Sequence, residues 1–136
     1  MAAMLISTFL VEDQVTLRQT LVDTMEEIAP VKFVGLADSE NMAAQWLADH
    51  KGDWDLAIVN LFLEQGSGLG VLKTCQLRRA QQKVVVLTDY CQPNLLQRCR
   101  ELGADEIFDK SQDVDKLVEF CKAHAQSLSG SSARPS

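Results

Sequence analysis

Short apolar runs rich in β-branched residues alternate along this chain with stretches in which apolar residues recur at a helical period. The apolar runs predict five strands, at residues 5–11, 32–37, 55–60, 83–88 and 104–109. The periodic stretches predict five helices, at residues 15–28, from a cap at 38 or 39 to Gly52, at about 68–79, at 94–102, and from a cap at 111 or 113 to about 126. This alternation predicts a parallel sheet with helices on both faces and right-handed crossovers.

Polar residues stand where four of these strands end. Glu12 and Asp13 follow the first strand, and Asn60 closes the third. Thr88 closes the fourth strand, and Lys110 follows the fifth. Because ligands bind beyond the carboxyl ends of the strands in such sheets, we expect these side chains to share one pocket. The two carboxylates suit Mg²⁺, whereas the hydroxyl and the ammonium can meet phosphoryl oxygens.

Length and composition narrow the classes of function. The chain has 136 residues, 46% hydrophobic and 24% charged, which favours one soluble globular domain over residues 1–126. Its formal net charge of -6 argues against a nucleic-acid or anionic-membrane partner. No apolar run is long enough to span a bilayer, and the N-terminus lacks the basic region of a secretory signal. Residues 127–136 are rich in Ser and predict a disordered tail.

The four cysteines carry no sign of a metal site or a disulfide framework. None forms a C-x-x-C pair, and all lie in or beside predicted helices, at positions 75, 91, 99 and 121. Reduced thiols of this kind favour a cytoplasmic protein.

Taken together, these residues resemble the receiver domain of two-component response regulators, over roughly residues 4–126. The resemblance rests on the polar strand ends and on two further runs. Gly103-Ala104-Asp105 precedes the fifth strand, and Gly66-Ser67-Gly68-Leu69 enters the third helix. The resemblance implies a flavodoxin-like (βα)5 fold with the strand order 2-1-3-4-5. It also implies a phosphorelay signalling protein rather than an enzyme.

The resemblance further implies a role for each residue of the site. Position 60 would be the phosphoacceptor, with Thr88 and Lys110 coordinating the phosphoryl group and Ile107 at the switch position. Mg²⁺ would be held by Glu12, Asp13, the side chain at position 60 and the backbone carbonyl of Phe62. The partners implied are a sensor histidine kinase or a phosphotransfer protein and a downstream protein, and a homodimer is compatible with the family. The face formed by helix four, strand five and helix five would be the docking surface.

Asn60 departs from the family, which has an aspartate there. An amide nitrogen shares its lone pair with the carbonyl, so we expect no phosphorylation of Asn60 by the usual route. The site also loses one negative charge. A unit-charge pair at ~4 Å is worth ~4 kcal/mol at an effective dielectric of 20, before desolvation is subtracted, so we expect weakened Mg²⁺ binding.

Two other departures put the family's conformational relay in doubt. The switch position, usually aromatic, is the stiff β-branched Ile107, and the adjacent Phe108 should point to the opposite face of the sheet. The residue after Lys110, often a proline in a cis bond, is Ser111.

Three hypotheses remain at this point. A stand-alone phospho-receiver could carry an Asp→Asn change at position 60, and retention of the other four site residues favours this origin. A natural pseudo-receiver would bind its partners without phosphorylation. A Mg²⁺-dependent or flavin enzyme on the same fold is the remote alternative, because the segment after the first strand is not a phosphate-binding loop and position 60 lacks a nucleophilic aspartate.

Overall fold

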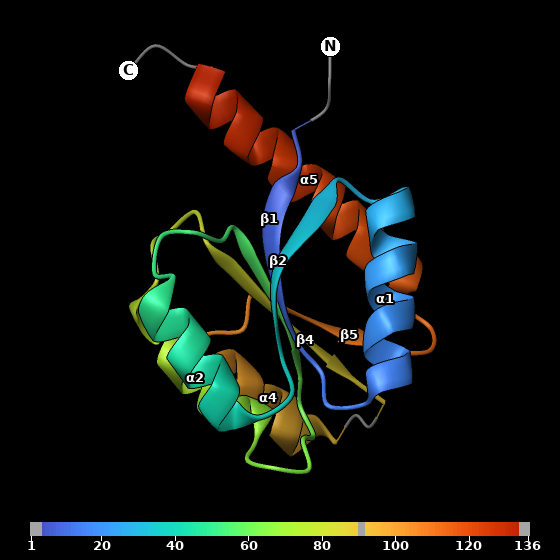
Figure 1. The fold of residues 1–136 in the computed structure, drawn as a ribbon, viewed down its shortest axis with the longest axis vertical. Coiled ribbons are helices and arrows are strands. Elements are labelled where there is room, and N and C mark those ends of the chain that lie inside the picture. The colour runs from blue at the N-terminus through green and yellow to red at the C-terminus, as the bar shows by residue number, and fades with distance from the viewer. Residues whose placement is uncertain (1–3, 90–91, 134–136) are drawn as a thin grey trace.

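The computed structural model describes residues 4–89 and 92–133 (Figure 1). One five-stranded sheet runs through it. Its strands are β1 (Ile6–Val11), β2 (Val31–Ala37), β3 (Leu56–Asn60), β4 (Lys83–Thr88) and β5 (Glu106–Asp109). All neighbouring strands are parallel, in the order β2-β1-β3-β4-β5. The predicted fold and strand order are therefore confirmed.

Five helices and one 3₁₀ turn connect the strands. They are α1 (Val15–Ile28), α2 (Glu40–Asp49), α3 (Gly68–Thr74), the 3₁₀ turn η1 (Cys75–Leu77), α4 (Pro93–Glu101) and α5 (Val114–Ala133). Ser39 rather than Asp38 caps α2, because its Oγ accepts a hydrogen bond from the N–H of Met42 at 3.1 Å. Pro93 occupies the first turn of α4, as predicted. No helix among the described residues is long and apolar enough to cross a bilayer.

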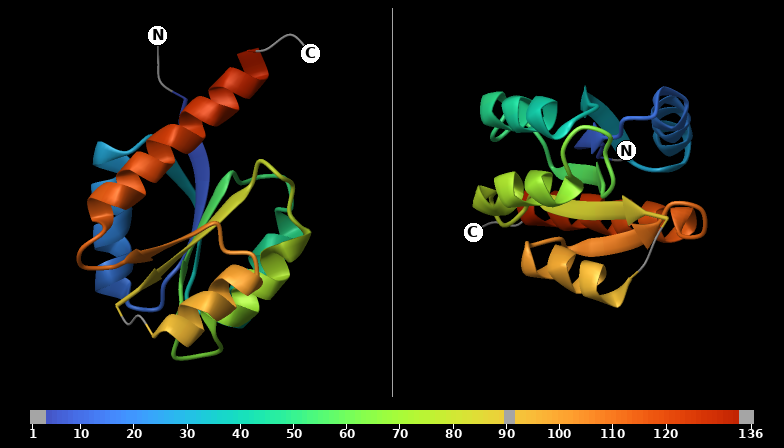
Figure 2. Two further views of the ribbon diagram at one scale, coloured as in Figure 1. Left: turned by 180° about the vertical axis from the view of Figure 1, so that it is seen from behind. Right: turned by 90° about the horizontal axis from the view of Figure 1, so that it is seen from below.

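Helices cover both faces of the sheet, α1 and α5 on one and α2, α3 and α4 on the other (Figure 2). Strand alternation divides the core between the two faces. Phe9 of β1 and Val86 of β4 pack on the α2–α4 side, whereas Leu10 and Val85 pack on the α1–α5 side. β3 is buried along its whole length, as its unbroken apolar sequence predicts.

Several predicted boundaries differ from the structure, among them those of the third helix, the fifth strand and the last helix. The third helix ends at Thr74 and tightens into the 3₁₀ turn η1, short of the predicted end at 79. β5 begins at Glu106, two residues later than expected. The helix α5 continues to Ala133, so the disordered tail predicted from residue 127 is wrong for residues 127–133. Residues 134–136 and Cys91 lie outside the described residues, and a domain boundary at 126 stays a prediction.

Candidate functional site

Strand register aligns the polar strand ends on the side of the sheet where the carboxyl ends of the strands lie. Val11 pairs with Val59 across β1 and β3, and Asn60 pairs with Leu87 across β3 and β4. Thr88 pairs with Asp109 across β4 and β5. The residues that follow β1 and β5 therefore lie at the same level as the residues that close β3 and β4. The strand ends therefore converge at this side of the sheet, and the sharing of one pocket by all five side chains stays a prediction.

Glu12 is the centre of the site. Its side chain is 1% exposed, and its Oε1 lies 3.0 Å from Nζ of Lys110, itself 11% exposed. Its Oε2 accepts hydrogen bonds from the backbone N–H of Gln14 at 3.1 Å and from Nδ2 of Asn60 at 3.2 Å. Its backbone carbonyl accepts a bond from Arg18 at 3.0 Å. A buried carboxylate is tolerated only when it is paired and hydrogen-bonded, and Glu12 is both.

Asn60 directs its amide nitrogen at two acceptors. Besides Glu12, Nδ2 donates to the backbone carbonyl of Phe62 at 2.8 Å. A backbone carbonyl can only accept, so the contact with Phe62 fixes which end of the amide faces it. Asn60 is 5% exposed, and no buried side-chain nitrogen or oxygen among the described residues lacks a hydrogen-bond partner. The amide is thus an integrated part of the site.

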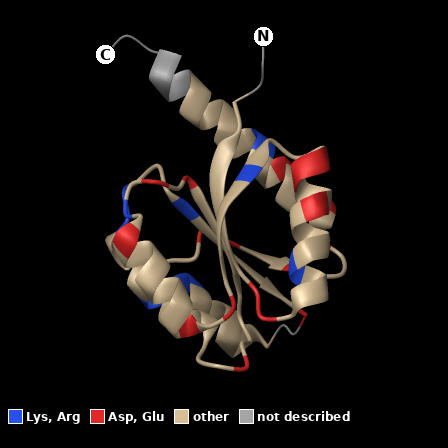
Figure 3. Cartoon of the chain, viewed as in Figure 1, with Lys and Arg blue, Asp and Glu red and all other residues tan. Residues whose placement is uncertain are grey.

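Asp13 lies further out, at the rim of a cavity of about 320 Å³. Burial raises the pKa of its carboxyl, but the hydrogen bond from the N–H of Glu64 at 2.8 Å and the charge of Lys110 act the other way, and the net effect lowers this pKa. Glu64 and Asp89 also line the cavity. Figure 3 shows acidic residues in the loops at this edge of the sheet. The solvent-facing rim is therefore anionic around Lys110.

Thr88 and Ile107 occupy the positions that the resemblance assigns to the switch. Thr88 is fully buried at the end of β4, and its carbonyl accepts the backbone N–H of Lys110 at 3.2 Å. Ile107 packs against the core on the α2–α4 side, whereas Phe108 packs on the α1–α5 side beside Phe120. The prediction that Phe108 faces away from Ile107 is confirmed. The switch roles of Thr88 and Ile107 stay predictions.

The loop after β5 is held by a carboxylate that the sequence reasoning overlooked. Oδ1 of Asp109 accepts hydrogen bonds from Oγ of Ser111 at 2.7 Å, from its backbone N–H at 2.8 Å and from the N–H of Gln112 at 3.1 Å. The side-chain bond from Ser111 is the main reason that the pKa of Asp109 is lowered. No cis peptide occurs among the described residues. An Asp two positions before a Ser is an Asx-turn signal, which could have indicated this turn from the sequence.

Glu40, at the start of α2, is another missed residue. Its Oε1 accepts the N–H of Ser67 at 2.8 Å, and its own N–H donates to the carbonyl of Gln65 at 3.1 Å. These bonds tie α2 to the loop between β3 and α3, which carries Phe62. No local motif marks Glu40, because its partners lie 25 or more residues away along the chain.

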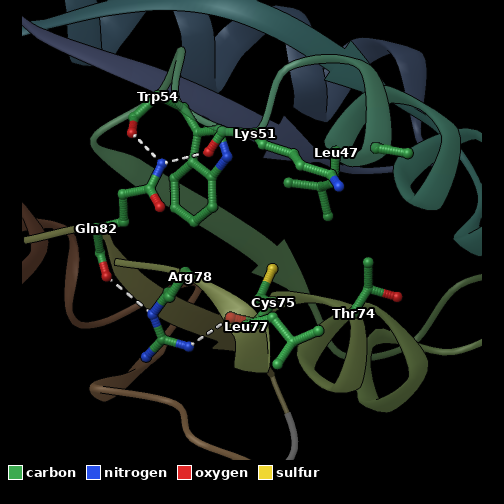
Figure 4. Close-up of a pocket in the computed structure, with 9 residues that line it drawn as sticks. Leu47, Lys51, Trp54, Thr74, Cys75, Leu77, Arg78 and Gln82 are labelled. Carbon is green, nitrogen blue, oxygen red and sulfur yellow. Dashed lines mark hydrogen bonds between the residues drawn. The ribbon is translucent and has the colours of Figure 1, made fainter. Parts of the chain in front are cut away.

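A second cavity, of about 290 Å³, lies between α2 and η1, near the amino-terminal ends of β3 and β4 (Figure 4). Gln82 lines this cavity, and its Nε2 donates to the carbonyls of Lys51 at 2.9 Å and Trp54 at 2.8 Å. Cys75 faces this region, and burial raises the pKa of its thiol to about 12. Such a thiol is a poor nucleophile, so Cys75 gives this cavity no reactive cysteine.

The four predicted metal-binding groups do not fit a divalent cation as they stand. Glu12 and the Phe62 carbonyl accept N–H donors, and Asn60 turns its nitrogen toward both. Asp13 is engaged by the backbone of Glu64. Within the described ranges, no group of three or more His, Cys, Asp or Glu side chains is arranged to hold a metal ion.

Comparison with known proteins agrees with this architecture. The profile of the response regulator receiver domain matches residues 8–122. The chain belongs to the response regulator receiver family. One curated relative of this receiver domain is the photosynthetic apparatus regulatory protein RegA of Rhodobacter capsulatus, 27% identical over 128 residues. That alignment covers 90% of this chain and 64% of the relative, so the receiver spans less than two thirds of its relative's length.

Solved receiver structures share the fold. A LuxR-family DNA-binding response regulator from Staphylococcus aureus superposes with a TM-score of 0.78 at 21% identity, covering 89% of this chain and 99% of that one. The response regulator domain of Thermotoga maritima CheB gives a TM-score of 0.76 at 17% identity, covering 90% of this chain and 97% of that one. At these identities the likeness establishes the fold alone.

Proposed function

We propose that this receiver domain acts in two-component signalling through protein contacts and is not phosphorylated at position 60. The observation that carries the proposal is the amide of Asn60, whose nitrogen donates to Glu12 and to the Phe62 carbonyl. A phosphoacceptor must offer a nucleophile, which an ionised carboxylate at this position would supply. An amide oxygen carries no full negative charge, and the amide nitrogen is already committed to two hydrogen bonds.

The partners we propose are a sensor histidine kinase or phosphotransfer protein and a downstream signalling protein, with a homodimer as a further assembly. The face formed by α4, β5 and α5 is the proposed docking surface, since β5 is an edge of the sheet and lies between these helices. The net charge of -6 supports protein partners over nucleic acid or an anionic membrane. The proposal also includes stand-alone action in the cytoplasm. The three cysteines among the residues that the structure describes are buried and free, which is compatible with that compartment.

The proposal is tested with a small-molecule phosphodonor such as acetyl phosphate in the presence of Mg²⁺. Intact-protein mass spectrometry measures whether the chain gains one phosphoryl group. We expect no gain for the chain as it stands, because position 60 offers no carboxylate. Phosphorylation located at Asn60 would overturn the proposal.

The matched control is Asn60→Asp, which restores the carboxylate and leaves Glu12, Asp13, Thr88 and Lys110 in place. Labelling of this variant is expected if the site differs from a working phospho-receiver at one residue only. A variant that folds but takes up no phosphoryl group would contradict this expectation, and would place the chain among receivers whose site has changed at more than position 60. Binding of a histidine kinase by both forms would support phosphorylation-independent partner contacts.

A further inference from the structure

We propose that Nδ2 of Asn60, next to the ion pair of Glu12 with Lys110, takes the place of the divalent cation of a receiver site, so that this site is held in one state without a metal. The inference rests on the proposed function and deepens it, because it concerns how the same site is regulated. It predicts that the chain's stability and partner contacts are independent of Mg²⁺.

The first step is the arrangement of acceptors. Oε1 of Glu12 faces Nζ of Lys110 at 3.0 Å, and Oε2 faces Nδ2 of Asn60 at 3.2 Å. The same Nδ2 lies 2.8 Å from the carbonyl oxygen of Phe62. Hydrogen-bond donors thus already engage three oxygens that belong to the predicted metal-binding groups. The amide bridges the end of β1 and the loop after β3.

The second step compares the amide with a carboxylate of the same shape. An aspartate at position 60 would turn an oxygen, rather than an N–H, toward Glu12 and the Phe62 carbonyl. Oxygens that face one another repel unless a cation lies between them, and the side chains at positions 12 and 60 are only 1% and 5% exposed. The aspartate form therefore needs a cation, whereas the asparagine form supplies its own donor.

The third step is charge. Glu12 is neutralised by Lys110, and Asn60 carries no charge, so Asp13 is the one carboxylate of the predicted ligand set left to attract a cation. A cation entering the site would have to displace the amide and approach the ammonium of Lys110. Ionic attraction falls with each lost charge. We therefore expect the chain with Asn60 to bind divalent ions about tenfold more weakly than the aspartate form, or more weakly still.

The test uses Mn²⁺ as the probe, with its free concentration followed by electron paramagnetic resonance. The full chain and Asn60→Asp are titrated side by side, and their melting temperatures are recorded with and without Mg²⁺. We expect Mn²⁺ to bind Asn60→Asp at least about tenfold more tightly, and Mg²⁺ to raise the melting temperature of that variant alone. The double variant Asn60→Asp with Asp13→Asn is the control, and it should lose the gained affinity.

Equal Mn²⁺ affinity for the two forms, or an equal Mg²⁺ effect on both melting temperatures, would overturn the inference. That result would leave the proposed function standing as long as the chain takes up no phosphoryl group. Conversely, phosphorylation of Asn60 would overturn the proposed function whatever the metal titration gives. If Asn60→Asp folds only in the presence of Mg²⁺, the metal requirement of the aspartate form is itself supported.

Discussion

At the scale of single residues, the site depends on one nitrogen atom. Nδ2 of Asn60 serves two acceptors that belong to different segments, Glu12 after β1 and Phe62 after β3. Leaving a buried acceptor without its donor carries a desolvation penalty of about 1–3 kcal/mol. We therefore expect the amide to contribute to the stability of the fold.

Replacement of Asn60 by alanine tests this contribution. We expect Asn60→Ala to lower the free energy of unfolding by about 1–3 kcal/mol, because the buried Glu12 oxygen and the Phe62 carbonyl lose a donor. Urea denaturation followed by tryptophan fluorescence measures the change. Asn94→Ala, at an exposed position in the first turn of α4, is the control and should change stability by less than about 0.5 kcal/mol. Equal effects of the two substitutions would show that the amide contacts contribute nothing.

The ion pair between Glu12 and Lys110 makes a second prediction at this scale. Removing one partner of a buried pair leaves an uncompensated charge, so Lys110→Met should lower the free energy of unfolding by about 3 kcal/mol. Lys116→Met is the control, because Lys116 is 74% exposed and its pair with Asp113 spans 3.5 Å at the surface. In a double-mutant cycle, Glu12→Gln should recover part of the loss caused by Lys110→Met. Simple additivity of the two changes would contradict a direct coupling.

At the scale of elements, the loop between β3 and α3 is clamped from two sides. Glu40 of α2 bonds to the backbone of Gln65 and Ser67. Gly68 lies against the end of β3, where an added Cβ would come 2.5 Å from the carbonyl oxygen of Asn60 and 2.8 Å from Cα of Leu61. The absence of a side chain at residue 68 therefore sets how closely α3 approaches the site.

Gly68→Ala tests this close approach. The new methyl group meets backbone atoms that cannot rotate away, so we expect a loss of about 1–3 kcal/mol in the free energy of unfolding. Gly52→Ala is the matched control, since its Cβ would meet the flexible end of Arg79 at 3.2 Å and neither glycine has a positive φ. Thermal and urea unfolding of both variants decide the matter. A Gly68→Ala variant as stable as Gly52→Ala would show that the loop yields.

Elements were largely predictable because periodicity and strand alternation are local signals. The limits of α1 and β4 agree with the sequence pattern residue for residue. The end of α5 was missed because the Ser-rich composition after 126 favours disorder, although Leu128 extends the apolar stripe of Leu117 and Cys121 onto the core. Tertiary packing, which composition does not reveal, stabilises the helix beyond residue 126.

The same distinction holds for the site. The sequence was enough to predict that the polar ends of four strands lie together. The alternation of strands and helices implies a parallel sheet, in which the carboxyl ends of the strands lie on the same side. The orientation of the Asn60 amide, the Asp109 turn and the Glu40 clamp could not, because each depends on side-chain geometry set by neighbouring segments. Position was predictable, and hydrogen-bond partners were not.

At the scale of the whole molecule, the two core layers together enclose three buried thiols among the described residues. Cys75 and Cys99 lie in the layer under α2–α4, and Cys121 in the layer under α1 and α5. Burial raises the pKa of Cys75 and of Cys121 to about 12, against ~8.5 for an exposed cysteine, and it also raises the pKa of Cys99. Above roughly pH 9 the unfolded chain has lost these protons, whereas the folded chain keeps them. The folded state then binds more protons, so the free energy of unfolding falls as the pH rises toward 12.

Each buried thiol should contribute about 1.4 kcal/mol per pH unit to this alkaline loss. Cys75→Ser and Cys121→Ser are therefore expected to flatten the dependence of unfolding free energy on pH between roughly 9 and 11, measured by urea denaturation, even where the substitution lowers stability at neutral pH. Val71→Ala, a buried change in the same layer as Cys75, should lower stability at every pH without altering the slope. Parallel curves for the unsubstituted chain and the cysteine variants would mean that these thiols ionise equally in both states, and that the alkaline loss arises from other groups.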